Sequence, residues 1–214
     1  MSYLLHIDAS SLGAGSVSRQ VEASFRDGWT GEVVHRDLAA APIPHLTAAG
    51  ISARATDPAR RTPQEAAAAA VQDELIEEFL GAGGYLFTVP LYNYSMPSVF
   101  KAWLDQIVVV GRTMETPGGP PAAGRPALLI SARGGAYGPG TPQHGMDHLV
   151  PTLETVLGPR TLGLAVTVIT PELTLAPVVP QFADLIGLHE ASLADSHARA
   201  RQLGKTCGPL ASSR

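Results

Sequence analysis

A strand, a loop and a helix are predicted in succession by the stretch Gly84-Tyr85-Leu86-Phe87-Thr88-Val89-Pro90-Leu91-Tyr92-Asn93-Tyr94-Ser95-Met96-Pro97-Ser98. The apolar run from Tyr85 to Val89 predicts a buried strand, and the proline that follows ends it because proline cannot donate to a sheet. An amphipathic run over residues 99–107 predicts the helix, with Ser95 or Ser98 as its cap. The aromatic loop between strand and helix lies where open α/β sheets bind ligands.

Outward from this stretch, strands and helices alternate along the whole chain. Such alternation implies one parallel sheet with helices on both faces. Five strands favour a flavodoxin-like three-layer sandwich of order 2-1-3-4-5, formed by a single domain over residues 1–214. The second strand is more polar and is expected at the sheet edge. The expected strands are 3–9, 32–38, 85–89, 126–131 and 162–169, and the expected helices are 18–31, 63–80, 99–107, 145–157 and 180–205, the last interrupted near Gly187.

The composition limits the classes of function. Hydrophobic residues make up 45% of the 214 residues and charged residues 16%, which is typical of a globular protein. The formal net charge of −4 gives no electrostatic reason to expect nucleic acid or an anionic membrane as a partner. Cys207 is the only cysteine, which excludes an intramolecular disulfide and a cysteine metal cluster. The first apolar run is short and has no basic leader, so we expect a strand there and a cytoplasmic protein.

Three loops follow the first, third and fourth strands, whose carboxyl ends meet at one edge of the predicted sheet. Residues 10–18 supply hydroxyls and a helix N-terminus, which suit a phosphate. Residues 90–94 supply flat apolar side chains and an amide, and residues 131–137 supply two glycines that let a planar ligand approach the backbone. Each loop by itself is also typical of an ordinary cap or turn. Together they predict a site for a phosphate and a flat, polar-edged ring, which describes flavin mononucleotide (FMN).

Through these residues the chain resembles the FMN-dependent NAD(P)H azoreductases, which are close to the flavin quinone reductases. The resemblance covers nearly the whole chain and implies a homodimer with each flavin near the subunit interface. It also implies which residues touch the cofactor. The phosphate would be held by Ser10, Ser16, Val17 and Ser18, one side of the isoalloxazine by Pro90, Leu91, Tyr92, Asn93 and Tyr94, and its pyrimidine edge by Ser131, Ala132, Arg133, Gly134 and Gly135.

The region after the central helix departs from the family pattern. An aromatic pair over the flavin is common there, but residues 111–117 contain no aromatic side chain. The segment 170–180 after the last strand is also brief. We assign Tyr137 and Met114 to the substrate side of the site. Because of these departures, the sequence does not indicate which electron acceptor the protein prefers.

Flavin chemistry explains why no catalytic triad is apparent, because the cofactor carries the difficult step. The resemblance implies that hydride moves from NADH or NADPH to flavin N5, and that a quinone or azo compound then binds at the same face. This order predicts ping-pong kinetics without a catalytic side chain. The Gly134 and Gly135 N–H groups are the candidates for stabilising the charge of the reduced flavin.

Other functions fit the sequence less well. A flavodoxin-type electron-transfer protein, the main alternative, would bind FMN without reacting with NAD(P)H by itself. The run Gly13 to Ser18 matches only two glycines of the dinucleotide fingerprint, although Asp37 lies near the place of its ribose-binding acid. A hydrolase would need a G-x-S-x-G elbow or a cysteine after the first strand, and the sequence has neither. His144 and His148 have metal-ligand spacing on a predicted helix, but no third ligand lies nearby, so no metal is expected.

Overall fold

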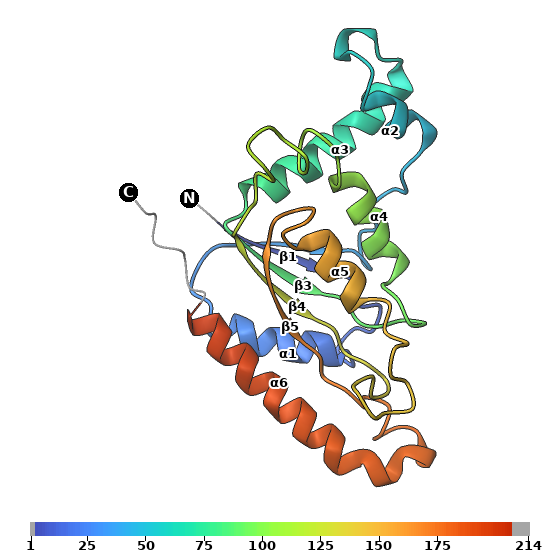
Figure 1. Ribbon diagram of the computed structural model, residues 1–214, viewed down its shortest axis with the longest axis vertical. Coiled ribbons are helices and arrows are strands. Elements are labelled where there is room, and N and C mark those ends of the chain that lie inside the picture. Colours follow the sequence, from blue (N-terminus) through green and yellow to red (C-terminus); the bar gives the residue numbers. More distant parts are fainter. Residues whose placement is uncertain (1–2, 207–214) are drawn as a thin grey trace.

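The computed structural model describes residues 3–206, so Cys207 lies outside the described residues. Its centre is a parallel sheet of five strands (Figure 1). The strand order is β2-β1-β3-β4-β5, which confirms the predicted order and the edge position of the second strand. The strands are β1 (Leu4–Asp8), β2 (Val33–Asp37), β3 (Gly84–Thr88), β4 (Pro126–Ile130) and β5 (Ala165–Ile169).

Helices cover both faces of the sheet, as the alternation predicted. One face carries α1 and α6, and the other carries α3, α4 and α5, while α2 and the start of α3 project beyond the sheet (Figure 1). The α-helices are α1 (Val17–Arg26), α2 (Ala48–Ala53), α3 (Pro63–Gly81), α4 (Ser98–Ile107), α5 (Val150–Leu157) and α6 (Ile186–Thr206), and the 3-10 helices are η1 (Pro58–Arg60) and η2 (Pro180–Leu185).

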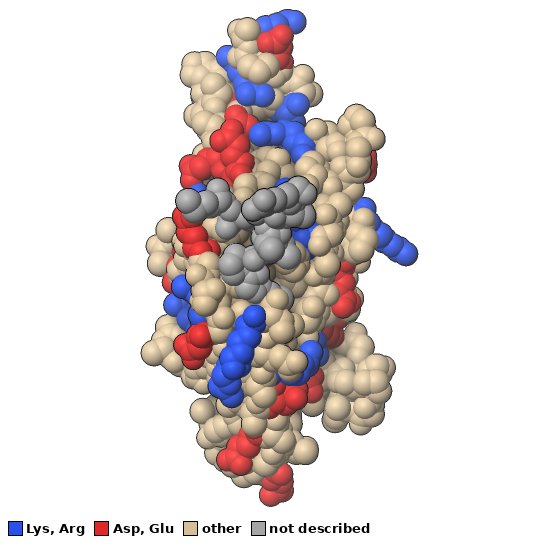
Figure 2. Space-filling view, turned by 90° about the vertical axis from the view of Figure 1, so that its left-hand side faces the viewer, with Lys and Arg blue, Asp and Glu red and all other residues tan. Residues whose placement is uncertain are grey.

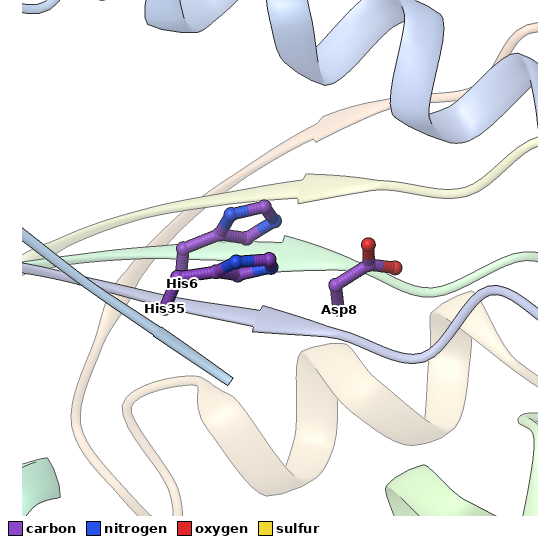
Figure 3. A group of neighbouring side chains, drawn as sticks. All are labelled: His6, Asp8 and His35. Atoms are coloured by element: carbon purple, nitrogen blue, oxygen red, sulfur yellow. The ribbon is translucent and has the colours of Figure 1, made fainter. Parts of the chain in front are cut away.

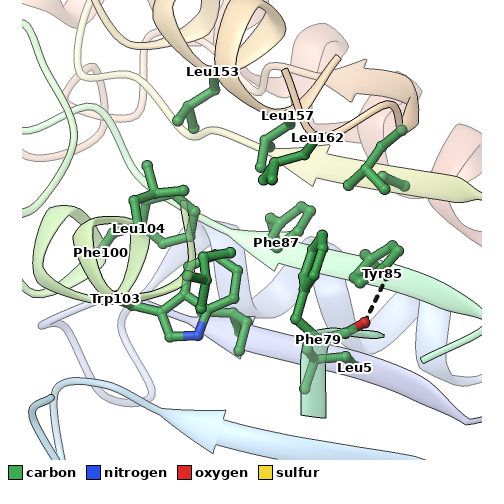
Figure 4. Packing of buried hydrophobic residues seen from close by; sticks show 14 of the residues in the cluster. Leu5, Phe79, Tyr85, Phe87, Phe100, Trp103, Leu104, Leu153, Leu157 and Leu162 are labelled. Atoms are coloured by element: carbon green, nitrogen blue, oxygen red, sulfur yellow. Dashed lines mark hydrogen bonds between the residues drawn. The ribbon is translucent and has the colours of Figure 1, made fainter. Parts of the chain in front are cut away.

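The larger hydrophobic core lies between the sheet and helices α3, α4 and α5. Tyr85 and Phe87 of β3 pack with Phe79 of α3 and with Phe100 and Trp103 of α4 (Figure 4). All five side chains are almost completely buried. The Tyr85 hydroxyl donates to the carbonyl of Phe79 at 2.8 Å, and burial raises the pKa of this phenol to about 12. This aromatic cluster holds β3 rigidly beneath the loop that follows it.

The smaller core lies between the sheet and helices α1 and α6. Leu4, Leu86 and Leu128 point to this face from three neighbouring strands and meet Phe25 of α1 and Ala200 of α6. Successive strand residues therefore face opposite layers, as the period of two requires. The continuous apolar runs of β1, β3 and β4 are explained by burial on both faces.

Two helix starts illustrate how local sequence sets the boundaries. Ser16 caps α1 by accepting from the Arg19 N–H, and Thr62 with Glu65 forms a capping box at the start of α3. The cap expected for α4 was wrong. Its N-cap is Pro97, and within the residues that the structure describes no side chain caps this helix.

Two predicted boundaries were also wrong. Helix α1 ends at Arg26, short of Gly31, and α5 begins at Val150, because residues 141–149 form turns. The predicted interruption of the C-terminal helix near Gly187 is confirmed, since the 3-10 helix η2 changes to the α-helix α6 at Ile186. Periodicity identified α1, α3, α4, α5 and α6 and placed their ends less well, because fraying and turn chemistry act at the ends.

Basic and acidic side chains are interspersed on the face of the molecule shown in Figure 2, without an extended patch of either sign. This distribution fits the small net charge and the absence of an electrostatic reason for nucleic acid binding at that face. Within residues 3–206, no helix is long and apolar enough to cross a bilayer.

Candidate functional site

A cavity of about 500 Å³ opens at the carboxyl ends of β1, β3 and β4. The parallel register brings Asp8, Thr88 and Ile130 to the same level, so the three following loops begin side by side. A fourth segment, after β5, closes the remaining side. The cavity is lined by Ser10, Leu12, Gly15, Ser16, Val17, Ser18, Pro90, Leu91, Tyr92, Asn93, Ala132, Gly134, Thr174, Leu175 and Val178.

The loop after β1 prepares an anion site. Ser16 accepts from the Arg19 N–H at 3.2 Å, and the Ser10 hydroxyl donates to Ser16 at 2.8 Å. The N–H groups of Val17 and Ser18 begin helix α1 and find no acceptor among residues 3–206. Free N–H groups at a helix N-terminus and the helix dipole together favour a phosphate.

The buried carboxylate of Asp8 and the half-buried carboxylate of Asp37 hold this loop in place through Arg19. Arg19 pairs with Asp8 and with Asp37, each at 2.8 Å, and also donates to the carbonyl of Ser10 at 3.0 Å. Burial raises the pKa of Asp8, although the Ser10 N–H and Arg19 act in the opposite direction. Asp37 is thus engaged as a structural partner of Arg19, away from the ribose-binding role that the dinucleotide interpretation would give it.

The loop after β3 is a tight turn with an unusual backbone. Tyr92 and Ser95 exchange backbone hydrogen bonds, and the two residues between them, Asn93 and Tyr94, have φ of 49° and 68°. Left-handed geometry at two central residues is that of a type I′ turn, and it costs free energy at tyrosine. The Tyr92 hydroxyl accepts from the N–H of Ser11 at 3.2 Å, which joins this loop to the phosphate loop.

The loop after β4 lies against the segment that follows β5. The carbonyls of Gly134 and Gly135 accept from the N–H groups of Leu175 and Leu173. The two glycine N–H groups find no acceptor within the described part of the chain. They are therefore available to a ligand's hydrogen-bond acceptors.

A second cavity of about 280 Å³ adjoins the first and shares Leu91, Asn93, Gly134 and Leu175 with it. Three aromatic side chains line this second cavity together with an amide. Its other residues are Tyr94, Gly135, Tyr137, Gln143 and Phe182. Burial, with Tyr94 nearby, raises the pKa of the Tyr137 phenol, which therefore stays protonated at neutral pH.

Comparison with known proteins agrees with this architecture. The model of a family described by its flavodoxin-like fold matches residues 2–166, which is more than half of the chain. The chain belongs to the flavodoxin-like family. An FMN-dependent NADH:quinone oxidoreductase of Streptomyces coelicolor is 44% identical over 206 residues, which cover 94% of this chain and 92% of the relative. A protein of the same description from Frankia alni is 43% identical and covers 94% and 99%.

Solved structures of flavodoxin-like proteins show the same fold. An azoreductase from Bacillus anthracis superposes with a TM-score of 0.79 at 24% identity, over 96% of this chain and 100% of that one. An FMN-dependent NADH-azoreductase from Bacillus anthracis, in complex with FMN, gives 0.75 at 21% identity, over 95% and 100%. The family prediction made from the three loops is thus confirmed.

Within this flavodoxin-like frame, most predicted site residues line one of the two cavities. Ten of them line the larger cavity, and Tyr94, Gly135 and Tyr137 line the smaller one. Three do not line either cavity. Ser131 and Arg133 are buried behind the loop after β4, and Met114 lies in a turn against Val109 and Gly111. The turn after α4 keeps Met114 beside α4, so its place on the substrate side stays a prediction that these cavities do not support.

Seven residues that line the two cavities were not among the predicted site residues. Leu12 and Gly15 belong to the predicted phosphate loop, and Thr174, Leu175 and Val178 lie in the segment after β5 that was noted as brief. In the structure Leu12, Leu175 and Val178 are 58%, 43% and 70% exposed near the cavity. Gln143 comes from the turns before α5 and Phe182 from the 3-10 helix η2, and the position of both segments depends on tertiary packing.

Two places in this flavodoxin-like chain hold histidines in a spacing that metal ligands can have. Ligand atoms of His6, Asp8 and His35 lie within 4.8 Å of one another (Figure 3). The two imidazoles are stacked with centroids 4.5 Å apart, Asp8 is paired with Arg19, and His6 Nε2 lies 2.9 Å from the Thr88 hydroxyl. Stacked rings and an engaged carboxylate do not form a ligand set, because the ring lone pairs do not converge. We therefore assign this cluster no metal.

The second place was the histidine pair of the predicted helix. His144 and His148 lie in the turns before α5, so they do not share a helix face as their spacing predicted. Both side chains are exposed. Their spacing is therefore no indication of metal binding.

The geometry fits FMN. Val17 and Ser18, which have free N–H groups, line the larger cavity from the start of α1, and Gly134 lines it from the loop after β4, with Gly135 in the adjoining cavity. Leu91, Tyr92 and Leu175 add flat apolar surface to the larger cavity. A dianionic phosphate and a ring with polar edges match these two sets of donors.

Proposed function

We propose that this protein is an FMN-dependent NAD(P)H oxidoreductase that reduces quinones and azo compounds. One observation carries the proposal: Val17 and Ser18, whose N–H groups are free, line the same cavity as Gly134, and the adjoining cavity is lined by Gly134 and Gly135, whose N–H groups are also free. The names of the relatives at 44% and 43% identity support the same activity.

Each group in the larger cavity has one task. Val17 and Ser18 donate to the phosphate, and the Ser10 and Ser16 hydroxyls complete that end. Leu91 to Asn93 line one face of the isoalloxazine, and Leu175 lies beside it. Gly134 and Gly135 donate to the pyrimidine edge, where preorganised N–H groups stabilise developing negative charge. FMN held by these residues would supply the hydride-transfer chemistry between NADH or NADPH and a second substrate.

The smaller cavity is the place for the nicotinamide and, after its release, for the electron acceptor. Tyr94, Tyr137 and Phe182 provide aromatic contacts that suit a planar quinone or azo compound. These three side chains thus take the place of the aromatic pair over the flavin that residues 111–117 lack. The protonated phenol of Tyr137 can donate a hydrogen bond to the acceptor. A shared site for both substrates gives ping-pong kinetics.

The assembly and location belong to the same proposal. We place the protein in the cytoplasm as a homodimer of single-domain chains, with small molecules and no nucleic acid or membrane as partners. Apolar side chains around the cavities, among them Val178 and Tyr94, are more exposed than is usual and suit coverage by a second chain.

The visible spectrum of the purified protein tests the function. We expect a flavin band that bleaches with NADH under anaerobic conditions and returns when a quinone is added. Colourless protein that cannot take up added FMN would refute the proposal. Sequential instead of ping-pong kinetics would refute the shared site while leaving FMN chemistry intact.

The alternative is a flavodoxin-like electron-transfer protein without intrinsic NAD(P)H activity. It would show the same flavin band but would bleach only through a separate reductase. The adjoining aromatic cavity favours the enzyme, since a carrier of electrons between proteins has no need for a second small-molecule site.

A further inference from the structure

Arg133 follows β4 and comes directly before the two glycines of the site. It was expected to contact the flavin, but its side chain lines neither cavity and is only 10% exposed. The guanidinium instead pairs with Asp147 at 2.6 Å and with Glu172 at 3.1 Å. The two carboxylates are only 12% and 25% exposed, so burying the arginine between them costs desolvation free energy. This cost indicates that the arrangement has a role beyond stability.

The Asp147 side of this arrangement leads to the aromatic loop. Asp147 Oδ1 accepts from the N–H groups of Leu149 and Val150 and so organises the start of α5. The neighbouring His148 N–H donates to the carbonyl of Tyr94 at 3.0 Å. A displacement of Asp147 would therefore also move His148, and through it the loop that lines one face of the proposed flavin site.

The Glu172 side leads to the substrate cavity. Glu172 Oε1 accepts from the Tyr137 N–H at 3.1 Å, and the Arg133 guanidinium lies 5.6 Å from the centre of the Tyr137 ring. The backbone of Arg133 is also bound on both sides, since its N–H donates to Pro171 and its carbonyl accepts from Thr174. This fastens residues 133–137 against the segment after β5.

We propose that Arg133, Asp147 and Glu172 form a clamp that positions three walls of the cofactor and acceptor site at once. Arg133 is the positioning residue of this Arg133 clamp, and it acts through Gly134, Gly135 and Tyr137 without touching the cofactor. This proposal rests on the proposed function for the identity of the cofactor. The contacts of the clamp are those of the protein without cofactor.

The planar guanidinium is needed because it can donate to two carboxylates in different directions. Lysine keeps the charge but presents a single ammonium, so it bridges both partners less well. Glutamine leaves two half-buried carboxylates near one another without their shared cation, so we expect Asp147 and Glu172 to repel each other. The loops they hold are then displaced in opposite directions.

Arg125, at the other end of β4, provides a matched control. Arg125 directly precedes β4 and is half-buried, and its guanidinium donates to the carbonyls of Leu80 and Ala82 at 2.6 and 2.7 Å. It lies at the amino end of the sheet, away from both cavities. Replacing Arg125 by glutamine lowers stability without disturbing the site.

The first experiment measures the dissociation constant of FMN by fluorescence quenching for wild type, R133Q, R133K and R125Q. We expect R133Q to weaken FMN binding by about tenfold or more, R133K by less, and R125Q by less than about twofold. Equal losses of stability in R133Q and R125Q, with FMN affinity unchanged in both, would show a merely structural role and overturn the proposal.

A second readout needs no flavin and therefore separates this proposal from the proposed function. Amide hydrogen exchange of the apo protein should rise in R133Q over residues 133–137, 147–150 and 172–175 together, and should stay at the wild-type rate there in R125Q. Exchange that rises in only one of the three segments would refute a common clamp, whether or not the protein binds FMN.

A milder variant covers the case in which R133Q does not fold. E172Q keeps the shape and still accepts from Tyr137, but it removes one negative charge beside the Tyr137 N–H and the Arg133 guanidinium. The midpoint potential of bound FMN should become more positive, because reduced flavin gains negative charge. An unchanged potential in E172Q, together with unchanged exchange in residues 133–137, would also refute the proposal.

Discussion

His6 and Glu22 face each other beneath helix α1, where both are removed from water. His6 Nδ1 lies 3.6 Å from Glu22 Oε1, and the two side chains are 2% and 15% exposed. Burial, followed by the neighbouring His35, lowers the pKa of His6 well below its ordinary range. Burial raises the pKa of Glu22 to about 7. The pair is therefore a neutral imidazole beside a carboxyl that titrates near neutrality, and not an ion pair.

These two residues make opposite contributions to stability as the pH changes. The carboxyl of Glu22 binds protons more tightly in the folded state, so its stabilisation is complete below 4.5 and is lost as the pH rises toward 7. The imidazole of His6 binds protons less tightly in the folded state, so its stabilisation is present above 6.5 and is lost as the pH falls.

Replacing Glu22 with glutamine should therefore leave the His6 effect unopposed. We compare wild type with E22Q by the difference between their free energies of unfolding. This difference should shift by about 2 kcal/mol in favour of wild type when the pH is lowered from 8 to 5. Urea denaturation at both pH values measures this difference. The exposed Glu190 provides the control, since E190Q should differ from wild type by the same amount at both pH values. A pH-independent effect of E22Q would contradict the assignment.

Tyr94 illustrates strain at a single residue. Its φ of 68° is a left-handed conformation that costs roughly 1–2 kcal/mol for residues with a Cβ, and its side chain is 44% exposed. We expect Y94G to be more stable than Y94A by about 1 kcal/mol in the apo protein, the reverse of the order found in helices. Chemical denaturation of the two variants measures the difference. A more stable Y94A would show that the turn changes its backbone when the tyrosine is removed.

At the scale of elements, the closest helix contact is between α1 and α6. A Cβ on Gly204 would lie 2.1 Å from the carbonyl oxygen of Phe25, and a Cβ on Gly28 would lie 2.9 Å from the backbone nitrogen of Lys205 in α6. Glycine therefore allows the ends of the two helices to touch. This contact closes the layer that covers β1 on the face of the smaller core.

Substituting alanine at two glycines of α6 separates this contact from helix propensity. G204A should lower the free energy of unfolding by about 1–3 kcal/mol, because the added methyl group forces the helices apart. G187A, where a Cβ would meet nothing within 4 Å, should raise it by roughly 0.5–1 kcal/mol. Thermal and urea unfolding measure both. Stabilisation by both substitutions would mean that the helix ends are further apart than described.

At the scale of the whole molecule, the site is a consequence of sheet order. The order 2-1-3-4-5 puts the ends of β1, β3 and β4 next to one another, and the loops after them come from residues far apart in sequence. A single hydrogen bond from Ala132 N–H to the Ser18 hydroxyl, at 3.2 Å, already joins two loops that are 114 residues apart. A ligand that bridges these loops must stabilise the fold.

FMN should therefore raise the melting temperature in a concentration-dependent way. At a hundredfold excess over its dissociation constant the gain is about 2.7 kcal/mol, or roughly 5–10 °C for a chain of this size. Riboflavin lacks the phosphate, so at the same concentration it should raise the melting temperature much less. Differential scanning fluorimetry at fixed protein concentration compares them. Equal shifts would place the phosphate away from the start of α1.

Much of the fold and site could be predicted because local patterns carry them. Apolar runs identified all five strands, and the serine-rich, aromatic and glycine loops identified most residues of the larger cavity. The errors fall where a distant partner decides. Arg133 was expected to face the ligand but turns to Asp147 and Glu172, which are 14 and 39 residues away in the sequence.

The sequence by itself determined the alternation of elements, the strand order and the three loops of the site, because periodicity and turn chemistry act between near neighbours. Only the tertiary structure decided what surrounds those loops. The segment after β5 supplies Leu175 and Val178, the turns before α5 supply Gln143, the 3-10 helix η2 supplies Phe182, and Met114 lies outside both cavities. The physical reason is that irregular segments take their positions from the surfaces they pack against, and those surfaces exist only once the sheet has formed.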